Sequence, residues 1–248
     1  MRPEDLPEIR HLPLFRDMDK ANFDELVGRS YVQTFPAGLE MIRQGDPADF
    51  LHVVLGGGVE LYAKWRDREC TIAVVRPVST FILAACVKDA PYLMSARTLE
   101  RSRIMLIPAP ELRALFRRDP DFAVSVMNEL AASYRAIVRN TKGLKLRNSR
   151  ERVASYFLRQ SRLVDDAPSY ILPVEKRLLA SYLGMTPENL SRTLKALEEY
   201  GVKVDGTRVI ITDRAKLTDL AQPDTLIDGP DPDALGSGSS LPPVQRRA

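Results

Sequence analysis

A short run in the last third of the chain carries side chains that could read a DNA sequence. Glu188, Ser191 and Arg192 lie close together along the chain. An arginine can donate two hydrogen bonds to guanine, a carboxylate can accept one from cytosine N4, and a serine hydroxyl can bond a base or contact the thymine methyl. The side chains that could position the DNA backbone around them are Thr186, Asn189, Lys195 and Arg208. This set of residues indicates contact with duplex DNA.

Two predicted helices joined by a tight turn present these side chains. The first helix lies within residues 173–183, where leucines recur at helical spacing. Gly184 supplies the positive φ that ends it, and Thr186 and Pro187 are a preferred N-cap and first residue for the second helix. The second helix then has an apolar face formed by Leu190, Leu194 and Leu197. The pattern predicts a helix-turn-helix, although a surface helical hairpin with a solvated polar face would show the same periodicity.

A predicted β-hairpin follows the second helix. Gly201 ends the helix, and two β-branched runs at 202–204 and 208–211 flank the sequence Asp-Gly-Thr. Asp-Gly between such runs is a strong signal for a tight hairpin turn. A helix-turn-helix followed by a small hairpin is a winged helix, whose hairpin commonly meets the phosphate backbone. Arg208 is the hairpin residue expected to make that contact.

The run LASYLGMTPENLSRTLKALEEYGV resembles the DNA-binding segment of the bacterial cyclic-AMP receptor and fumarate-nitrate regulator (CRP/FNR) superfamily. In that family the recognition helix carries Glu, two residues and then Ser-Arg or Gly-Arg, which here are Glu188, Ser191 and Arg192. The Ser-Arg form is similar to the fumarate-nitrate branch and implies half-sites resembling TTGA. Position 187 is proline rather than the arginine of the cyclic-AMP branch, so one base contact of that branch should be missing. The resemblance also implies contact with RNA polymerase, for which the loop 163–170 is a candidate, with a plain connector as the alternative.

The N-terminal half consists of short β-rich runs punctuated by glycine. Several short strands separated by turn signals predict a β-sandwich or barrel. Residues 38–62, GLEMIRQGDPADFLHVVLGGGVELY, resemble the cyclic-nucleotide-binding jelly roll of the same superfamily. We expect His52 in this segment to be a strand residue rather than a haem or metal ligand, because no second ligand is near it in sequence.

The residues that hold a cyclic nucleotide in this family are replaced here. Its cyclic-nucleotide binders use a Gly-Glu pair and a later Arg-Ser or Arg-Thr pair, where this chain has Leu83-Ala84 and Met94-Ser95. Burying an anionic phosphate without the arginine would be costly. We therefore expect no binding of cyclic AMP or cyclic GMP through this cassette. An apolar ligand or haem would suit a pocket whose lining includes Phe81, Leu83, Leu93 and Met94, and side chains that simply fill the barrel are the alternative.

A long helix within residues 119–146 is predicted to pair two copies of the chain. Its apolar and small residues recur at alternating spacings of three and four, as in a coiled-coil seam. The seam is formed by Ala123, Val126, Leu130, Ser133, Ile137, Asn140 and Leu144. The adjacent face, with Phe122, Met127, Tyr134 and Val138, is then expected to pack on the helix's own barrel. A two-fold dimer would place two recognition helices in successive major grooves of a palindromic operator.

Composition limits the remaining classes of protein. The chain has 248 residues, of which 44% are hydrophobic and 28% charged, as in an ordinary globular protein. No apolar run approaches the roughly 20 residues of a membrane span and no secretory signal is visible, so we expect a cytoplasmic location and no membrane partner. The net charge is only +3, but nine basic residues and one acid lie between Arg135 and Arg162, which gives a local field suited to phosphates or simply a solvated face. Cys70 and Cys86 have no metal-ligand spacing and are expected to be buried thiols.

Together these features predict an α+β protein that acts as a homodimeric, sequence-specific transcription regulator. Its expected parts are a jelly-roll sensor domain at 1–118, a dimerisation helix at 119–146, a winged helix-turn-helix domain at 147–221 and a disordered tail at 222–248. A metal-dependent barrel enzyme would need clustered histidines with a carboxylate, and the chain has 2 isolated histidines. An effector-gated interaction module that does not bind DNA is the other alternative, which the recognition helix argues against.

Overall fold

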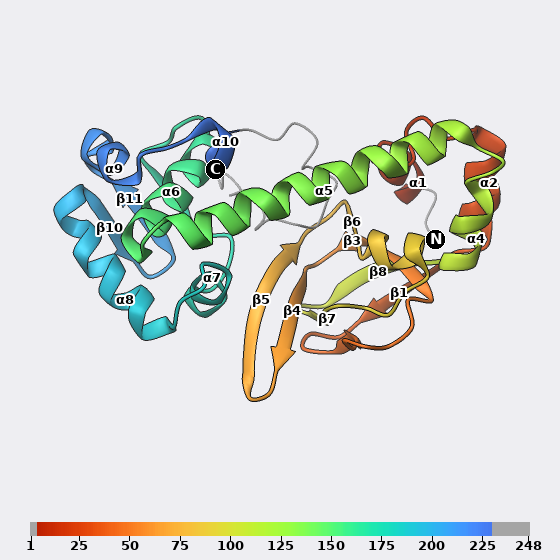
Figure 1. The fold of residues 1–248 in the computed structure, drawn as a ribbon, viewed down its shortest axis with the longest axis horizontal. Coiled ribbons are helices and arrows are strands. Elements are labelled where there is room, and N and C mark those ends of the chain that lie inside the picture. The colour runs from red at the N-terminus through yellow and green to blue at the C-terminus, as the bar shows by residue number, and fades with distance from the viewer. Residues whose placement is uncertain (1–3, 230–248) are drawn as a thin grey trace. The chain divides into compact units, whose positions relative to one another are not determined.

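The computed structural model describes residues 4–229, which form two compact units. The first unit holds the described residues up to 136 and the second holds residues 137–229. One long helix, α5 (Pro120–Leu146), contributes residues to both units (Figure 1). The remainder of the predicted disordered tail, residues 230–248, lies outside the described residues.

The first unit is a β-roll accompanied by short helices. Its strands are β1 (Tyr31–Phe35), β2 (Glu40–Ile42), β3 (Phe50–Gly56), β4 (Val59–Trp65), β5 (Arg68–Val75), β6 (Ser79–Phe81), β7 (Ser95–Thr98) and β8 (Ser102–Pro108). Its helices besides the start of α5 are α1 (Asp5–Arg10), α2 (Lys20–Gly28), α3 (Leu83–Lys88) and α4 (Ala109–Leu115). This architecture confirms the predicted N-terminal jelly roll.

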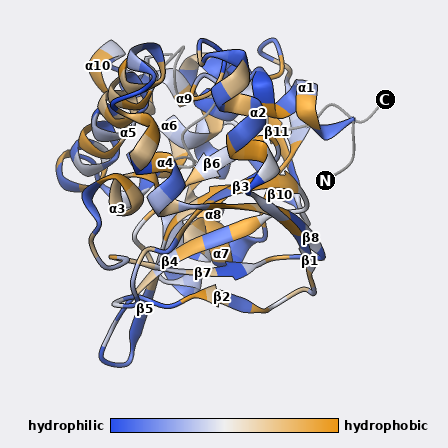
Figure 2. Ribbon diagram, turned by 90° about the vertical axis from the view of Figure 1, so that its right-hand side faces the viewer, coloured by the Kyte–Doolittle hydropathy of each residue, from blue (hydrophilic) through white to orange (hydrophobic). Residues whose placement is uncertain are grey.

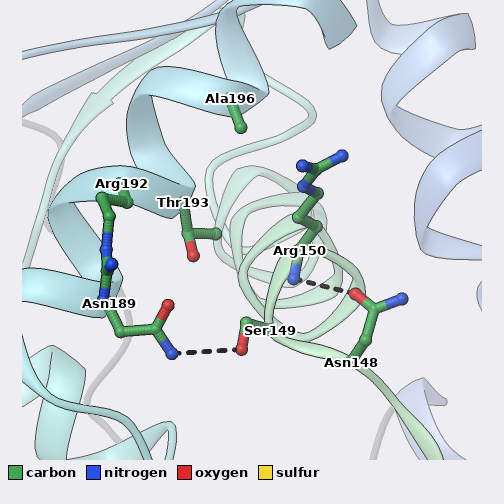
Figure 3. A pocket seen from close by; sticks show the side chains of 7 residues that line it. All are labelled: Asn148, Ser149, Arg150, Asn189, Arg192, Thr193 and Ala196. Atoms are coloured by element: carbon green, nitrogen blue, oxygen red, sulfur yellow. Dashed lines mark hydrogen bonds between the residues drawn. The ribbon is translucent and has the colours of Figure 1, made fainter.

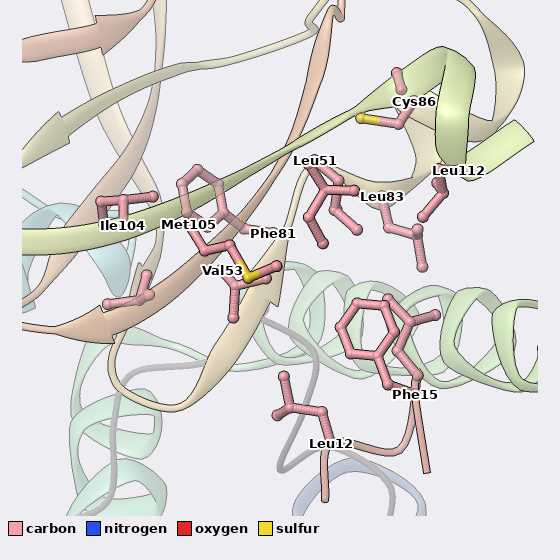
Figure 4. Close-up of a cluster of buried hydrophobic side chains, with 14 of the residues drawn as sticks. Leu12, Phe15, Leu51, Val53, Phe81, Leu83, Cys86, Ile104, Met105 and Leu112 are labelled. Atoms are coloured by element: carbon pink, nitrogen blue, oxygen red, sulfur yellow. The ribbon is translucent and has the colours of Figure 1, made fainter. Parts of the chain in front are cut away.

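Two antiparallel sheets enclose the core of the first unit. One has the strand order β1-β8-β3-β6 and the other β2-β7-β4-β5. Because side chains alternate along a strand, Val59 and Leu61 of β4 enter the core while Glu60 between them faces the other side of the sheet. Figure 4 shows part of this core, to which α4 and the segment before α2 also contribute side chains. The far end of the β4–β5 hairpin is hydrophilic, as Figure 2 shows.

The second unit contains the predicted winged helix-turn-helix. Its elements after α5 are α6 (Ser149–Arg162), β9 (Ser169–Ile171), α7 (Lys176–Tyr182), α8 (Pro187–Ala196), the 3₁₀ turn η1 (Leu197–Tyr200), β10 (Val202–Asp205), β11 (Arg208–Ile211), α9 (Arg214–Ala221) and α10 (Thr225–Asp228). The strands form one antiparallel sheet in the order β10-β11-β9. The fold class predicted from the sequence is therefore confirmed for both units.

Two predictions for the second unit are wrong in part. The predicted loop 163–170 ends in a strand, because β9 pairs with β11 and the Tyr170 hydroxyl donates to the Phe157 carbonyl at 3.0 Å. The predicted disorder does not begin at residue 222, because α10 forms a helical turn over Thr225–Asp228. Asp224 caps that turn by accepting a hydrogen bond from the Leu226 N–H.

Candidate nucleic-acid interface

The turn between α7 and α8 has the geometry that the sequence predicted. Gly184 has φ +65°, and a Cβ added there would lie 3.0 Å from Leu144 Cδ2. Thr186 is the N-cap of α8, and its hydroxyl oxygen accepts a hydrogen bond from the Asn189 N–H at 3.2 Å. Pro187 follows as the first helical residue. Local residue preferences therefore fix where α8 starts and which way it points.

Helix α8 is held in place by its apolar side. Leu190 and Leu194 are buried, as is Leu197 in the η1 turn that follows. The helix packs against α6, α7 and β10 of the same unit. Because these leucines all lie on one side of the helix and are buried, the opposite, polar side of α8 faces solvent.

The polar face of α8 brings together most of the predicted DNA-reading residues. Glu188, Ser191, Arg192 and Lys195 are all exposed. A backbone hydrogen bond and the Thr186 hydroxyl lower the pKa of Glu188, and the nearby Arg192 guanidinium lowers it further. The Glu188 carboxylate is therefore ionised at neutral pH and able to accept hydrogen bonds from a base.

A hollow of about 420 Å³ lies beside this face, between the start of α6 and α8 (Figure 3). It is lined by Asn148, Ser149, Arg150, Asn189, Arg192, Thr193 and Ala196. The Asn189 amide, which we expected to face DNA, donates to the Ser149 hydroxyl at 3.4 Å and so links the two helices. Arg150 and Arg192 are the two basic residues that line the hollow.

The first turn of α6 is well fixed at this hollow. The Asn148 side chain accepts hydrogen bonds from the N–H groups of Arg150 at 2.9 Å and Glu151 at 3.1 Å. The Glu151 carboxylate in turn accepts from the Asn148 N–H at 2.9 Å, which completes a capping box. A helix N-terminus next to two arginines suits a phosphate group of the DNA backbone. Arg150 belongs to the basic run that the sequence predicted to suit phosphates. Asn148 and Ser149 are not among the residues selected from the sequence, although the Asn-x-x-Glu capping pattern marks Asn148 as a helix start.

The hairpin after α8 forms the predicted wing, and a third strand that the sequence did not predict pairs with it. Asp205 pairs with Arg208 across a turn in which Gly206 has φ +55°. Strand β11 pairs on its other side with β9, so the wing is one side of a three-stranded sheet rather than an isolated hairpin. Arg208 is exposed at the start of β11, as a phosphate contact requires.

Several of the basic residues between Arg135 and Arg162 are engaged within the protein. Arg147 pairs with Asp228, and Arg152 donates to the Arg147 carbonyl at 2.7 Å. Arg159 lies over the Tyr156 ring, 5.8 Å from its centroid. These three side chains contribute to the folded structure. Because Asp228 offsets the charge of Arg147, the positive field is smaller by that residue than the sequence count indicates.

The predicted effector pocket is only partly assembled. Phe81 and Leu83 are buried, and Met94 is half-buried against the same core. Leu93, however, is 82% exposed, so its prediction as an interior lining residue is wrong. The chain leaves the strand conformation at Ile82, which has φ +66°, and then forms α3, a reversal that apolar spacing alone does not reveal.

Polar groups near the replaced cassette are already bound or uncharged. Arg97 follows Met94-Ser95 on β7, and its guanidinium donates to Glu60 at 2.7 Å and to Glu69 at 2.6 Å. Burial lowers the pKa of His52 to about 3, so its imidazole is neutral and stacks on Phe81 with ring centroids 5.0 Å apart. The guanidinium of Arg97 is thus already occupied by two carboxylates and is not free to bind a phosphate.

The two cysteines differ in their surroundings. Cys86 is buried as expected, and burial raises the pKa of its thiol to about 12. Cys70 on β5 is exposed, so the prediction of a buried thiol is wrong there, because the first three residues of the strand, Arg68, Glu69 and Cys70, all face solvent at this end of the hairpin. Within residues 4–229, no group of three or more His, Cys, Asp or Glu side chains could hold a metal ion.

The exposed face of α5 differs from the predicted seam. Val126 is 3% exposed and belongs to the core of the first unit, so it cannot also form a dimer seam. Met127, Tyr134 and Ile137 are the most exposed apolar side chains of the helix apart from its last residue, at 60%, 69% and 57%. With half-buried Leu130 and with Leu144 they form an apolar stripe at helical spacing, which we call the α5 stripe. The predicted roles of Met127 and Tyr134 as barrel contacts are therefore wrong, because each position along a helix turns the side chain by about 100°.

The described helices include none that is both long enough and apolar enough to cross a membrane.

Comparisons with known proteins match both units. The sequence model of the Crp-like helix-turn-helix domain matches residues 151–220, and that of the cyclic nucleotide-binding domain matches residues 32–119. The chain is similar to the "Cyclic AMP receptor protein" of Thermus thermophilus, with 26% identity over 211 residues that cover 84% of this chain and 96% of the relative. It is similar to "Transcriptional activator protein FnrL" of Cereibacter sphaeroides, with 26% identity over 240 residues that cover 88% and 91%. The solved structure of FixK2 from Bradyrhizobium japonicum shares the fold, with a TM-score of 0.67 and 22% identity over 79% of this chain and 98% of that one.

Proposed function

The chain belongs to the CRP/FNR superfamily of DNA-binding transcription regulators, and on that premise we propose that it reads a palindromic operator with TTGA-like half-sites. The observation that carries this proposal is the polar face of α8, where Glu188, Ser191 and Arg192 are exposed on a helix whose other side is buried. The relatives are transcription regulators rather than enzymes.

Each residue of this face has a proposed role. Arg192 contacts guanine, Glu188 contacts cytosine N4, and Ser191 contacts a thymine or a phosphate. The DNA backbone is positioned by Thr186, Asn189, Lys195 and Arg208, to which the hollow beside α8 adds Ser149 and Arg150. Asn189 acts through its hydrogen bond to Ser149 rather than as a free side chain.

The proposed operator symmetry requires two copies of the chain. The α5 stripe supports a two-fold dimer, because Met127, Tyr134 and Ile137 would otherwise leave large apolar side chains in water. Leu130, Ile137 and Leu144 keep the role predicted for them, and Met127 and Tyr134 replace Val126 and Ser133. Asn140 lies beside this stripe and is half-buried.

The signal that the first unit senses is proposed not to be cyclic AMP or cyclic GMP. Leu83-Ala84 and Met94-Ser95 offer no guanidinium, and Arg97 is bound to two carboxylates. An apolar ligand or haem beside Phe81 and Leu83, or a filled core without ligand, are the remaining alternatives. A calorimetric titration with cyclic AMP is expected to show no heat of binding, and micromolar binding would contradict the proposal.

Membership of the family suggests one further partner and a cellular location. RNA polymerase is a proposed partner, with the segment 163–168 before β9 as a candidate contact, and the cytoplasm is the proposed location.

Gel shifts at two salt concentrations, with a TTGA palindrome and a random duplex, test the proposal that the chain reads this operator. Specific binding should exceed random binding at both salts, whereas equal affinities would contradict a sequence-reading role.

A further inference from the structure

The last described segment, residues 222–229, folds back onto the second unit and buries no apolar side chain in doing so. Helix α10 has four residues, Thr225–Asp228, none of them buried, and its Leu226 is 70% exposed. A helix of this length is not stable by itself, because its few hydrogen bonds do not offset the cost of nucleation. Specific contacts must therefore hold it against the rest of the unit.

An ion pair with Arg147 supplies that hold. The Arg147 guanidinium donates two hydrogen bonds to the Asp228 carboxylate, at 2.7 Å and 2.6 Å. The two side chains are only 10% and 8% exposed, and Arg147 also reaches the Gln222 carbonyl at 3.4 Å. A two-pronged pair of this kind fixes the orientation of both groups.

Arg147 occupies the junction between two helices. It follows Leu146, the last residue of α5, and precedes Asn148, the N-cap of α6. Its carbonyl accepts a hydrogen bond from Arg152 of α6 at 2.7 Å. Its backbone is thus tied to α6, while its side chain is tied to the segment 222–228.

The charge of Asp228 suits this position at neutral pH. Burial raises the pKa of its carboxyl, but hydrogen bonds from Arg147 and the Asp224 N–H, and the charges of Arg147 and Arg159, lower it by more. The net pKa lies below the ordinary value, so the carboxylate stays ionised and the ion pair stays formed.

We propose that Asp228 is a positioning residue for DNA binding, which holds Arg147 and so sets the first turn of α6 against α8. That turn presents Ser149 and Arg150 at the hollow beside Arg192, and Ser149 is the residue that Asn189 of α8 binds. The inference rests on the proposed function, because it concerns how the DNA-binding face is kept in place. It assigns a role in DNA recognition to a segment that lies beyond the matched helix-turn-helix domain, which ends at residue 220.

The direction in which one substitution changes DNA affinity separates this role from a simple effect of charge. Asp228→Asn removes a negative charge from a protein that binds a polyanion, so a pure charge effect would tighten DNA binding. Positioning predicts the opposite, a loss of roughly tenfold in affinity for the operator, the scale of coupling within one ion-pair network. The salt dependence of binding should not change, since no phosphate contact is removed.

The experiment uses the full chain and the duplex that the wild-type protein selects from a random pool. Affinity is measured for wild type, Asp228→Asn, Arg147→Lys, Arg147→Gln and the double variant Arg147→Gln/Asp228→Asn, with thermal unfolding of each recorded. Arg147→Lys keeps the charge but not the two-pronged pair, so it should fold and lose affinity in the same direction. The double variant should bind no worse than the weaker single variant. Asp219→Asn, which removes an exposed acid from α9, is the matched control and should leave affinity within about twofold.

Each result has a consequence. Asp228→Asn that binds as tightly as wild type, or more tightly, overturns the inference while leaving the proposed function intact. A smaller salt slope for Arg147→Gln would show that Arg147 contacts phosphate itself, which also overturns it. If the wild-type chain selects no sequence, the proposed function fails instead.

Discussion

Arg192 is the residue on which recognition of the operator sequence is expected to depend most. It is exposed on the polar face of α8, one turn after the ionised Glu188. We expect Arg192→Ala to cost roughly 1–3 kcal/mol of binding free energy at the operator and little on random DNA, because guanine contacts carry specificity. Fluorescence anisotropy with both duplexes measures the two losses.

A matched control for Arg192 is available in the same unit. Arg162 is an exposed arginine at the end of α6, the far end from the hollow, so Arg162→Ala should leave both affinities nearly unchanged. Equal losses on operator and random DNA for Arg192→Ala would show that Arg192 touches only phosphate.

Arg208 should behave differently from Arg192. It is exposed on the wing beside a turn, where it can reach the backbone but has no helix to carry it into a groove. Arg208→Ala is therefore expected to weaken operator and random DNA alike and to reduce the salt slope by about one. Affinities at four salt concentrations give the slope, and an unchanged slope would remove Arg208 from the phosphate contacts.

Local spacing explains why some residues of the interface could be predicted and others could not. The outward position of Glu188, Ser191 and Arg192 depends only on where α8 starts and which of its leucines are buried, and both are written within one short run. Ser149 joins the interface through a hydrogen bond to Asn189, 40 residues away in sequence. The sequence carries no periodic signal for such a pair.

At the scale of elements, the start of α5 depends on one buried carboxylate. Asp119 is 3% exposed and accepts hydrogen bonds from the N–H groups of Phe122 and Asp19, both at 2.9 Å, and from the Asn22 amide at 3.1 Å. Asp119→Ala should lower the free energy of unfolding by roughly 1–3 kcal/mol, because it removes a helix cap and leaves the donors of two segments unpaired. Chemical denaturation at neutral pH measures the loss.

The same carboxylate predicts a pH dependence. Burial raises the pKa of Asp119, but the hydrogen bonds from Phe122, Asn22 and Asp19 lower it by more, so the folded-state pKa is below the ordinary value. The stability that Asp119 contributes is therefore complete above the ordinary pKa of about 4 and is lost as the pH falls through the lower folded value. The wild-type and Asp119→Ala proteins should converge in stability below that range. Asp121→Ala, at an exposed neighbour, is the control and should leave the free energy of unfolding at neutral pH nearly unchanged.

The elements that sequence patterns predicted are those stabilised by their own residues. The caps and leucines of α8 and the Asp-Gly turn of the wing act locally, and both elements are present. Strand β9 and helix α10 are too short to show a period. Strand β9 exists because β11 offers it a partner, and α10 is held by Arg147 from 81 residues away, so neither could be read from its own sequence.

For the molecule as a whole, the sequence leaves open which side of α5 packs on its own unit and which side is exposed to a second copy of the chain. The helix has apolar residues on more than one side, and shifting the assignment by one residue turns the chosen face by about 100°. The spacing of Val126 and Ser133 matches a seam as well as that of Met127 and Tyr134 does. Only packing decides, and it places Val126 in the core of the first unit.

The α5 stripe should therefore control dimerisation, and through it the recognition of a palindrome. Tyr134→Asp places a charge on the stripe of both copies, so we expect the dimer dissociation constant to rise on the order of a hundredfold. Asn128→Asp is the matched control, because Asn128 is exposed on the same helix but lies about 100° or more around the helix axis from Met127, Tyr134 and Ile137. Sedimentation velocity over a range of concentrations measures both. If Tyr134→Asp dissociates the dimer, operator affinity should fall toward that of a single half-site, whereas dissociation by Asn128→Asp alone would move the interface to another side of α5.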